Sequence, residues 1–405
     1  MNELSSNYLC RSCGKSLHAK TLDMGLQPLC NRFMLNQTDP EYNHNLALGV
    51  CLACGLMQLL DPPPVEEVAP RFSWITYNEP EAHLDQLADM LLGMVASKSD
   101  TVIAGVSYKD DTTLERLRRR GIDWVWRIAP EELGVGGSRA EIETVQKRLS
   151  VENSATIGKR HGCADIVVVR HILEHAHDVK AFLGALKMLM KPEGIIVFEV
   201  PDCKSVLSLK DYSTIWEEHV LYFTPATLSV CLESNGFEIL QMENYAYPLE
   251  NSLVVLARLQ KATHALPLTE QDRLLEINRV LDYFDSFPLE RAHYQQILEG
   301  YRKFGNKIVL FGAGHLACSY VNLMGLENYF EYILDDDPNR QGLFMPGSRL
   351  QIKSSAALYD QGISLCLLSL NPSNENRVIT KNRDFVERGG EFRSIFPTSD
   401  LALRS

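Results

Sequence analysis

The sequence of 405 residues predicts a doubly wound α/β protein with a small cysteine-rich region before it and a second α/β region after it. Three observations support this. Between residues 75 and 265, short β-branched runs alternate with helical stretches, as in a parallel sheet covered on both faces. Two Cys-x-x-Cys-Gly units precede residue 60, and a strand beginning at Lys307 ends in Gly-x-Gly.

Length and composition set the outer limits. A chain of 405 residues exceeds one ordinary core, and we expect domains at 1–74, 75–265 and 266–405. A net charge of −12 argues against a nucleic-acid partner and leaves a small-molecule substrate as the expected ligand. There is no apolar signal region and no run of about 18 apolar residues, so we expect no membrane span and a cytoplasmic location. The sequence does not indicate an oligomeric state.

The cysteine-rich region predicts a metal site. Ten cysteines in a cytoplasmic protein are not expected to form disulfides. CRSCG and CLACG are pairs that turn back on their own thiolates, and four thiolates form a closed, structural zinc site. The predicted ligands are Cys10, Cys13, Cys51 and Cys54, with Cys30 as a bystander or a substitute ligand.

The central region predicts buried strands at 100–106, 164–171, 193–202 and 250–259, with a helix at 182–190. Ligands of open α/β sheets bind beyond the carboxyl ends of the strands. The loops there carry a set of titratable side chains: Asp110, Asp111, His171, Glu174, His175 and Asp202. Such a cluster beside the aromatic segment IWEEHVLYFTP (215–225) predicts a functional cleft, although a single His or Glu at an edge is more often only solvated.

These residues resemble a known family, the nucleotide-sugar C-methyltransferases. The resemblance rests on CRSCG with CLACG, GLQPLCNRF (25–33), ILEHAHD (172–178), EEHVLYF (217–223) and LDDDPNRQGLFMPGSRLQI (334–352). It implies a zinc-binding domain, a methyltransferase-like sheet that uses S-adenosylmethionine (SAM), and a Rossmann-like C-terminal domain. The substrate class that it implies is a keto-deoxysugar attached to a nucleotide.

The resemblance also implies the catalytic residues Tyr77, His175, Glu218 and His219. Methylation of a carbon beside a ketone needs removal of a proton and stabilisation of an enolate, and an imidazole suits the first task. His219 would be the base and Glu218 would hold it in position. His175 or Tyr77 would donate to the enolate oxygen. The segment 77–86 is expected either to start a solvated helix or to close over the cleft.

The cofactor half departs from the family pattern. Where the family has an acidic residue and a glycine turn, this chain has IAGVSYKDDTT (103–113), and Ala129 stands where the second strand normally ends in a ribose-binding acid. The residues expected at the cofactor site are still those of the strand ends: Gly105, Ser107, Asp110, Asp111, Arg170 and His171.

The C-terminal region carries a dinucleotide-type fingerprint, Gly312-x-Gly314-x-x-Ala317, after a strand. Asp335 follows where an NAD ribose acid belongs. The same glycines are also explained by a tight turn and close helix packing in a domain that only covers the substrate, and we favour this second interpretation over bound NAD.

Four hypotheses therefore remain from the sequence. The first is a SAM-dependent C-methyltransferase acting on a nucleotide-linked keto sugar. The second is a methyltransferase-like protein without SAM that epimerises or isomerises a nucleotide sugar through His219 and His175. The third is an NAD-binding protein or dehydrogenase, and the fourth is a scaffold, because fold alone does not determine function.

Overall fold

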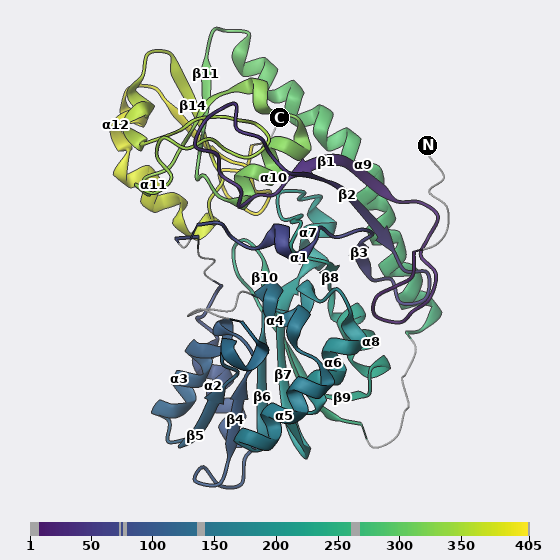
Figure 1. Cartoon of the computed structure of the whole chain (residues 1–405). Helices are drawn as coiled ribbons and strands as arrows, with labels where there is room; N and C mark the ends of the chain where they lie inside the picture. The colour runs from purple at the N-terminus through teal and green to yellow at the C-terminus, as the bar shows by residue number, and fades with distance from the viewer. Residues whose placement is uncertain (1–7, 73, 76–78, 136–141, 261–267, 404–405) are drawn as a thin grey trace.

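The computed structural model describes residues 8–72, 74–75, 79–135, 142–260 and 268–403 (Figure 1). These residues form three sheets, one for each region that the sequence predicts. No helix among them is long and apolar enough to cross a membrane.

The N-terminal sheet is antiparallel and takes its last strand from the central region. Its order is β1 (Leu22–Pro28), β2 (Asn43–Val50), β3 (Met57–Leu59) and β8 (Leu221–Tyr222). Met57 pairs with Tyr222 and Gln58 with Leu221. The segment EEHVLYF is thereby tied to the cysteine-rich region, which the sequence did not predict. The short helix α1 (Val65–Val68) follows β3.

The central sheet has the predicted α/β character. Its order is β5 (Trp124–Arg127), β4 (Val102–Gly105), β6 (Ala164–Arg170), β7 (Met190–Asp202), β10 (Asn251–Leu259) and β9 (Phe237–Tyr245). The first four strands are parallel, whereas β10 runs antiparallel to both β7 and β9. The expected strands are confirmed, and β9 is an additional strand that we did not predict.

Helices cover both faces of this sheet because its central strands are apolar on both sides. In β6, Ile166 and Val168 pack with α2 (Leu84–Gly93) and α3 (Asp111–Arg119). The intervening Val167 and Val169 face the opposite layer. That layer contains α4 (Ile142–Arg148), α5 (Val151–His161), α6 (Val179–Lys187) and α8 (Pro225–Ser234), and α7 (Cys203–Leu209) follows β7. The helix expected at 182–190 is α6.

The C-terminal sheet is parallel throughout, in the order β13 (Ile352–Lys353), β12 (Phe330–Leu334), β11 (Lys307–Phe311), β14 (Ile363–Leu368) and β15 (Glu391–Ser394). Its helices are α10 (His315–Met324), α11 (Glu375–Lys381) and α12 (Arg383–Glu387).

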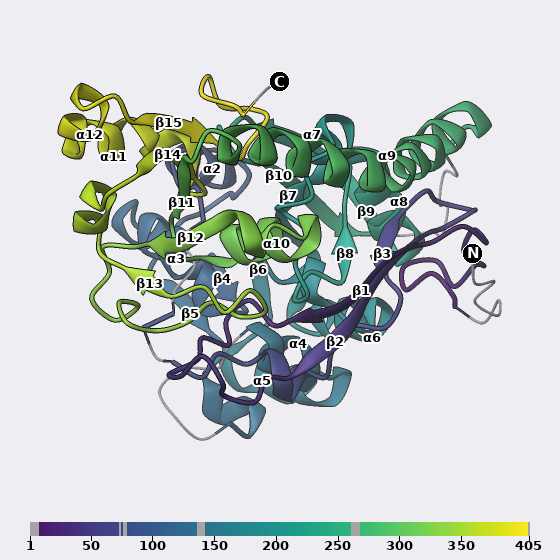
Figure 2. The same cartoon turned by 90° about the horizontal axis from the view of Figure 1, so that it is seen from above.

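One long helix, α9 (Glu270–Arg302), connects the regions and contacts β2, α7, α8, α10 and β11 (Figure 2). Its buried Tyr283 stacks on Tyr212 with ring centroids 4.2 Å apart. Apolar residues of β2, α9 and β11 share one core, so the N-terminal and C-terminal sheets are packed together rather than joined only by the chain.

Candidate functional site

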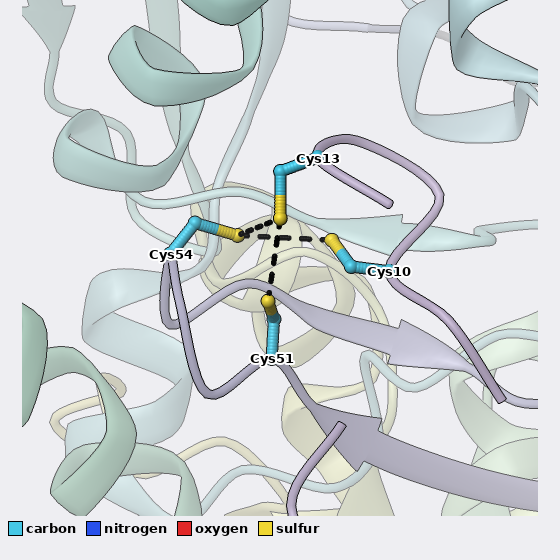
Figure 3. A group of neighbouring side chains, drawn as sticks. All are labelled: Cys10, Cys13, Cys51 and Cys54. Carbon is cyan, nitrogen blue, oxygen red and sulfur yellow. Dashed lines mark hydrogen bonds between the residues drawn. The ribbon is translucent and has the colours of Figure 1, made fainter. Parts of the chain in front are cut away.

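The four predicted zinc ligands converge in the N-terminal region (Figure 3). Sulfur–sulfur distances are 3.5 Å for Cys13–Cys51, 3.7 Å for Cys10–Cys54 and 3.8 Å for Cys13–Cys54. A tetrahedral zinc ion with bonds of about 2.3 Å separates its sulfurs by about 3.8 Å. The donor set therefore fits zinc, and four protein ligands leave no open position for chemistry.

The turns around these cysteines explain the glycine after each pair. Gly14 and Gly55 adopt φ of 71° and 74°, and their amides donate to the carbonyls of Cys10 and Cys51. A Cβ at Gly55 would lie 2.5 Å from Cβ of Glu276 in α9. Cys30 is not part of the group: its Sγ lies 3.6 Å from Ser319 Oγ, so it is a bystander.

A cavity of about 300 Å³ lies at the carboxyl edge of the central sheet. All three regions contribute to its wall. Its lining includes residues from the loops after β4, β6 and β7, from EEHVLYF, and from the fingerprint loop of the C-terminal region. The lining residues with polar or aromatic side chains, together with Gly314, include Glu79, Lys109, Glu143, His171, Glu174, His175, Trp216, Glu218, His219, Glu250, His315 and Arg340. The cleft that the sequence predicts thus exists, and His175, Glu218 and His219 line it. Tyr77 lies outside the described residues.

His175 is held by a carboxylate. It follows β6 in a 3₁₀ turn, Leu173–His175, and its Nδ1 lies 2.5 Å from Oε1 of Glu143 in α4. Both residues are buried. The rings of His175 and His219 meet edge to face with centroids 4.8 Å apart. A carboxylate–imidazole pair therefore stands beside a second imidazole in the cavity wall.

The environments of the two imidazoles push their pKa values in opposite directions. Burial, together with the nearby His175, lowers the pKa of His219 well below its usual 6.5. Burial also opposes charge on His175, but the Glu143 carboxylate outweighs it and raises the pKa of His175. Near neutral pH, His219 is consequently neutral, and the Glu143 carboxylate favours the protonated form of His175.

The two carboxylates of EEHVLYF are held by the motif GLQPLCNRF. Asn31 Nδ2 donates to Glu218 Oε1 at 2.9 Å, and the Cys30 amide donates to Glu217 Oε1 at 2.5 Å. Within the described residues no hydrogen bond joins Glu218 to His219, in contrast to the positioning role that the resemblance implied. Burial raises the pKa of Glu217 to about 7, and burial with Glu143 nearby raises that of Glu218.

A charged network connects the cavity residue His171 to the interior of the sheet. Arg170 and Glu199 are an ion pair within the sheet, and Oε1 of Glu199 lies 3.1 Å from Nε2 of His171. Burial opposes charge on His171, but Glu79 and Glu199 raise its pKa to about 10, so it is an imidazolium. Its φ of 49° is unusual for a residue with a side chain, and such strain is common at functional sites.

A side chain of the loop after β4 accepts hydrogen bonds from backbone amides of this loop and of β6. The carboxylate of Asp110, which is completely buried, accepts from the amides of Val106, Ser107 and Arg170 at 2.7, 2.8 and 2.8 Å. Burial raises its pKa to about 7. A Cβ at Gly105 would lie 2.7 Å from Leu114, so this glycine serves packing.

The predicted cofactor residues are therefore placed differently from one another. His171 lines the cavity. Gly105, Ser107, Asp110 and Arg170 are buried and are not among its lining residues. Asp111 pairs at 2.7 Å with Arg127, at the end of the strand that lacks the ribose acid. A methyl donor has to bind with this loop rearranged, or through contacts other than these amides.

The fingerprint loop of the C-terminal region has the predicted strand–turn–helix form. Gly312 has φ of 109°, and Gly314 precedes α10 and faces the cavity. Asp335, expected to hold a ribose, instead accepts from the Ala313 amide at 2.8 Å and from Arg340 at 2.9 Å. This favours the covering role of the domain over the binding of NAD.

Sequence reasoning missed Glu143 and the cavity residue His315, whereas Glu79 belongs to the segment 77–86 that was considered as a cover of the cleft. Glu143 lies in a short helix, and a carboxylate beside Ile142 and Val145 is a weak signal by itself. His315 stacks on Trp216 with centroids 4.3 Å apart and planes at 9°. Its place directly after Gly314 could have drawn attention to it, but only the fold brings it to Trp216.

Comparisons with known proteins agree with this architecture. A zinc binding domain matches residues 10–68, a methyltransferase domain 108–242, and a C-methyltransferase C-terminal domain 258–397. C-methyltransferase NovU of Streptomyces niveus is 25% identical over 399 residues, covering 95% of this chain and 94% of NovU. The chain is therefore similar to C-methyltransferases over nearly its whole length.

Solved structures similar to part of this chain include methyltransferases. One is the 1,6-didemethyltoxoflavin-N1-methyltransferase of Burkholderia thailandensis, at 13% identity and TM-score 0.29, covering 44% of this chain and 78% of that one. Another is a SAM-dependent methyltransferase of Anabaena variabilis, at 12% identity and TM-score 0.29, covering 45% and 86%.

The match to the zinc binding domain spans the group of four cysteines, in agreement with zinc as a cofactor. The match to the methyltransferase domain runs from the loop after β4 into β9, and so includes His175, Glu218 and His219. The candidate active site thus lies in the methyltransferase domain and is covered by the other two regions.

Proposed function

We propose that this protein is a SAM-dependent C-methyltransferase that acts on a keto-deoxysugar attached to a nucleotide. The observation that carries the proposal is the pairing of a neutral imidazole, His219, with a carboxylate-held imidazolium, His175, in one cavity wall. Such a pair suits proton removal from a carbon beside a carbonyl.

In the proposed step, the substrate carbonyl lies against His175 and the adjacent C–H against His219. His219 takes the proton, and His175 donates a hydrogen bond to the oxygen on which negative charge develops. Glu143 keeps His175 oriented and charged. SAM, when bound, supplies an electrophilic methyl group for the carbon that His219 has deprotonated.

Features of the opposite wall support a nucleotide-linked sugar. The first turn of α10 has only Gly314 as its cap, and Arg340 lines the cavity beside it. A helix N-terminus and a guanidinium both favour an anionic group such as a diphosphate. The stacked rings of Trp216 and His315 offer a flat surface to a sugar or a base.

A second candidate is acid/base chemistry on the same sugar without a methyl donor. The observation that favours it is the loop after β4, whose amides are occupied by Asp110. The same pair, His219 and His175, would then deprotonate and reprotonate one carbon. The outcome would be epimerisation or isomerisation.

One experiment separates the two candidates. The zinc-loaded protein is incubated in D2O with a panel of nucleotide-linked keto-deoxysugars, with and without SAM, and the products are analysed by mass spectrometry and NMR. A methylated sugar formed only with SAM is the result expected for a C-methyltransferase. Deuterium at the carbon beside the carbonyl in all conditions, with no methylation, would establish the second candidate instead. No change in any sugar would contradict both.

The pH dependence of deuterium exchange should be bell-shaped. The rate is lost at low pH as His219 becomes protonated, through a pKa below 6.5, and at high pH as His175 loses its proton, through a pKa above 6.5. Glu143→Gln removes the charge that raises the pKa of His175, so its high-pH limb should move to lower pH. The low-pH limb should move little. An unchanged high-pH limb in Glu143→Gln would show that His175 is not the acid.

A further inference from the structure

Several buried carboxylates gather around one imidazole of the cavity. Glu143, Glu174 and Glu218 are 3%, 1% and 7% exposed, and they surround His175. Glu250 also lines the cavity, and burial near Glu79 raises its pKa to about 8. Of the cations in the wall, Lys109 is paired with Glu79 at 2.5 Å, Arg340 with Asp335, and His171 with Glu199 and Glu174. Buried carboxylates are costly unless they are paired or coordinate a metal.

The donor atoms are close enough for one ion. Oxygens of Glu143 and Glu218 and a ring nitrogen of His175 lie within 4.8 Å of one another. A second set with the same spacing, Glu174, His175 and His219, shares His175 with the first. Both sets border the same cavity, so a bound ion would face the substrate space.

Among the described residues, Oε2 of Glu174 has neither a hydrogen bond nor an ion pair. Both of its carboxylate oxygens are buried and accept no hydrogen bond. The nearest cationic group is His171, whose Nδ1 lies 3.5 Å from Oε1. Buried polar groups are almost always satisfied, and an unsatisfied one indicates a place for a water molecule or an ion. Its backbone carbonyl accepts from the Val220 amide, which keeps the residue beside EEHVLYF.

We propose that this cavity binds a divalent cation, separate from the zinc of the four cysteines, between Glu143, His175 and Glu218, with Glu174 and His219 at its side. Asn31 donates a hydrogen bond to Glu218 and fixes its orientation, as hydrogen-bond partners of metal ligands commonly do. Two carboxylates and an imidazole suit Mn²⁺, Fe²⁺ or Zn²⁺, and the open side would take a substrate oxygen. The bound ion would take the place of the proton between Glu143 and His175. His175 is then a neutral ligand, and the ion instead of the imidazolium would face the substrate oxygen.

The test uses Mn²⁺ alone, without substrate or SAM. The full-length, zinc-loaded protein is titrated with Mn²⁺, and free Mn²⁺ is followed by electron paramagnetic resonance. We expect one Mn²⁺ per chain in addition to the retained zinc. Glu143→Gln and Glu218→Gln should each weaken binding at least about tenfold. Glu250→Gln is the matched control: it removes a carboxylate from the same cavity but lies outside both donor sets, and binding should be unchanged.

Zinc content and thermal stability are measured for every variant, so that loss of binding is read only from folded protein. Absence of a saturable Mn²⁺ site in the wild-type protein overturns the proposal without reference to any variant. Equal weakening by Glu250→Gln also overturns it, because the cavity would then attract cations only by its overall charge. Loss of methyl transfer with normal Mn²⁺ binding would contradict the proposed function and leave the cation site standing.

Discussion

Removal of the structural zinc should unfold the N-terminal region and lower the thermal midpoint of the protein by about 10 °C or more. The metal binds the folded state, and the folding free energy of this region therefore includes the binding free energy. Cys10, Cys51 and Cys54 are buried in the same core cluster as Leu56, Val220 and Phe223. Without the ion, the four cysteines lose the zinc–sulfur bonds that hold this region together.

Loss of zinc should also disturb the candidate active site. Gln58 in β3 accepts from the amide of Arg11, beside Cys10, and β3 pairs directly with β8 of EEHVLYF. The Leu59 amide also donates to the carbonyl of Val220, next to His219. Loss of zinc is therefore expected to abolish substrate turnover as well as to destabilise the fold.

Cys54→Ser tests this directly, with Cys163→Ser as its control. Cys163 is partly exposed and lies outside the cysteine group. Zinc content, the thermal midpoint by calorimetry and the rate of deuterium exchange are measured for both variants. If Cys54→Ser retains one zinc ion and the wild-type midpoint, the four cysteines do not form the stabilising centre.

Replacement of His219 by Gln should reduce the rate of deuterium exchange into the sugar by about 100-fold to 10,000-fold, the usual contribution of a positioned base. His219 lines the cavity and its lowered pKa keeps it neutral near pH 7. Glutamine is close in size and can occupy the space beside Trp216, but it cannot accept the proton. Binding of the substrate should change much less than the rate.

His161→Gln is the matched control for this variant. His161 lies in α5 and interacts with Glu132, away from the cavity. Exchange rates and KM are compared for the two variants and the wild type. An exchange rate of His219→Gln within about tenfold of the wild type would assign the base to another residue. The carboxylates Glu174 and Glu218 would be the next to test.

Several features of this protein could be predicted from local patterns. CRSCG and CLACG predicted the zinc ligands, because thiolates at that spacing chelate an ion whatever lies around them. The β-branched runs predicted β4, β6, β7, β10 and β11, because strands buried on both faces are apolar along their whole length. His175 and His219 were placed in one cleft because loops at the carboxyl ends of parallel strands meet at one edge.

Other features depend on the three-dimensional fold alone. Glu143 approaches His175 from α4, and Asn31 reaches Glu218 across 187 positions of the chain. Neither contact leaves a periodic signal, because each is made by a single side chain. The pairing of β8 with β3 was also hidden, since a strand of two residues has no alternation to read.

The loop after β4 also combines a feature visible in the sequence with one that only the fold decided. From the sequence alone, IAGVSYKDDTT could be recognised as a turn that departs from the family's glycine pattern. The tertiary structure decided where the carboxylate of Asp110 points: inward, to the amides of Val106, Ser107 and Arg170. The sequence by itself determined which chemical groups are available to this protein. The fold determined which of them are used up internally and which face the cavity, because burial and hydrogen bonding are set by neighbours distant in the chain.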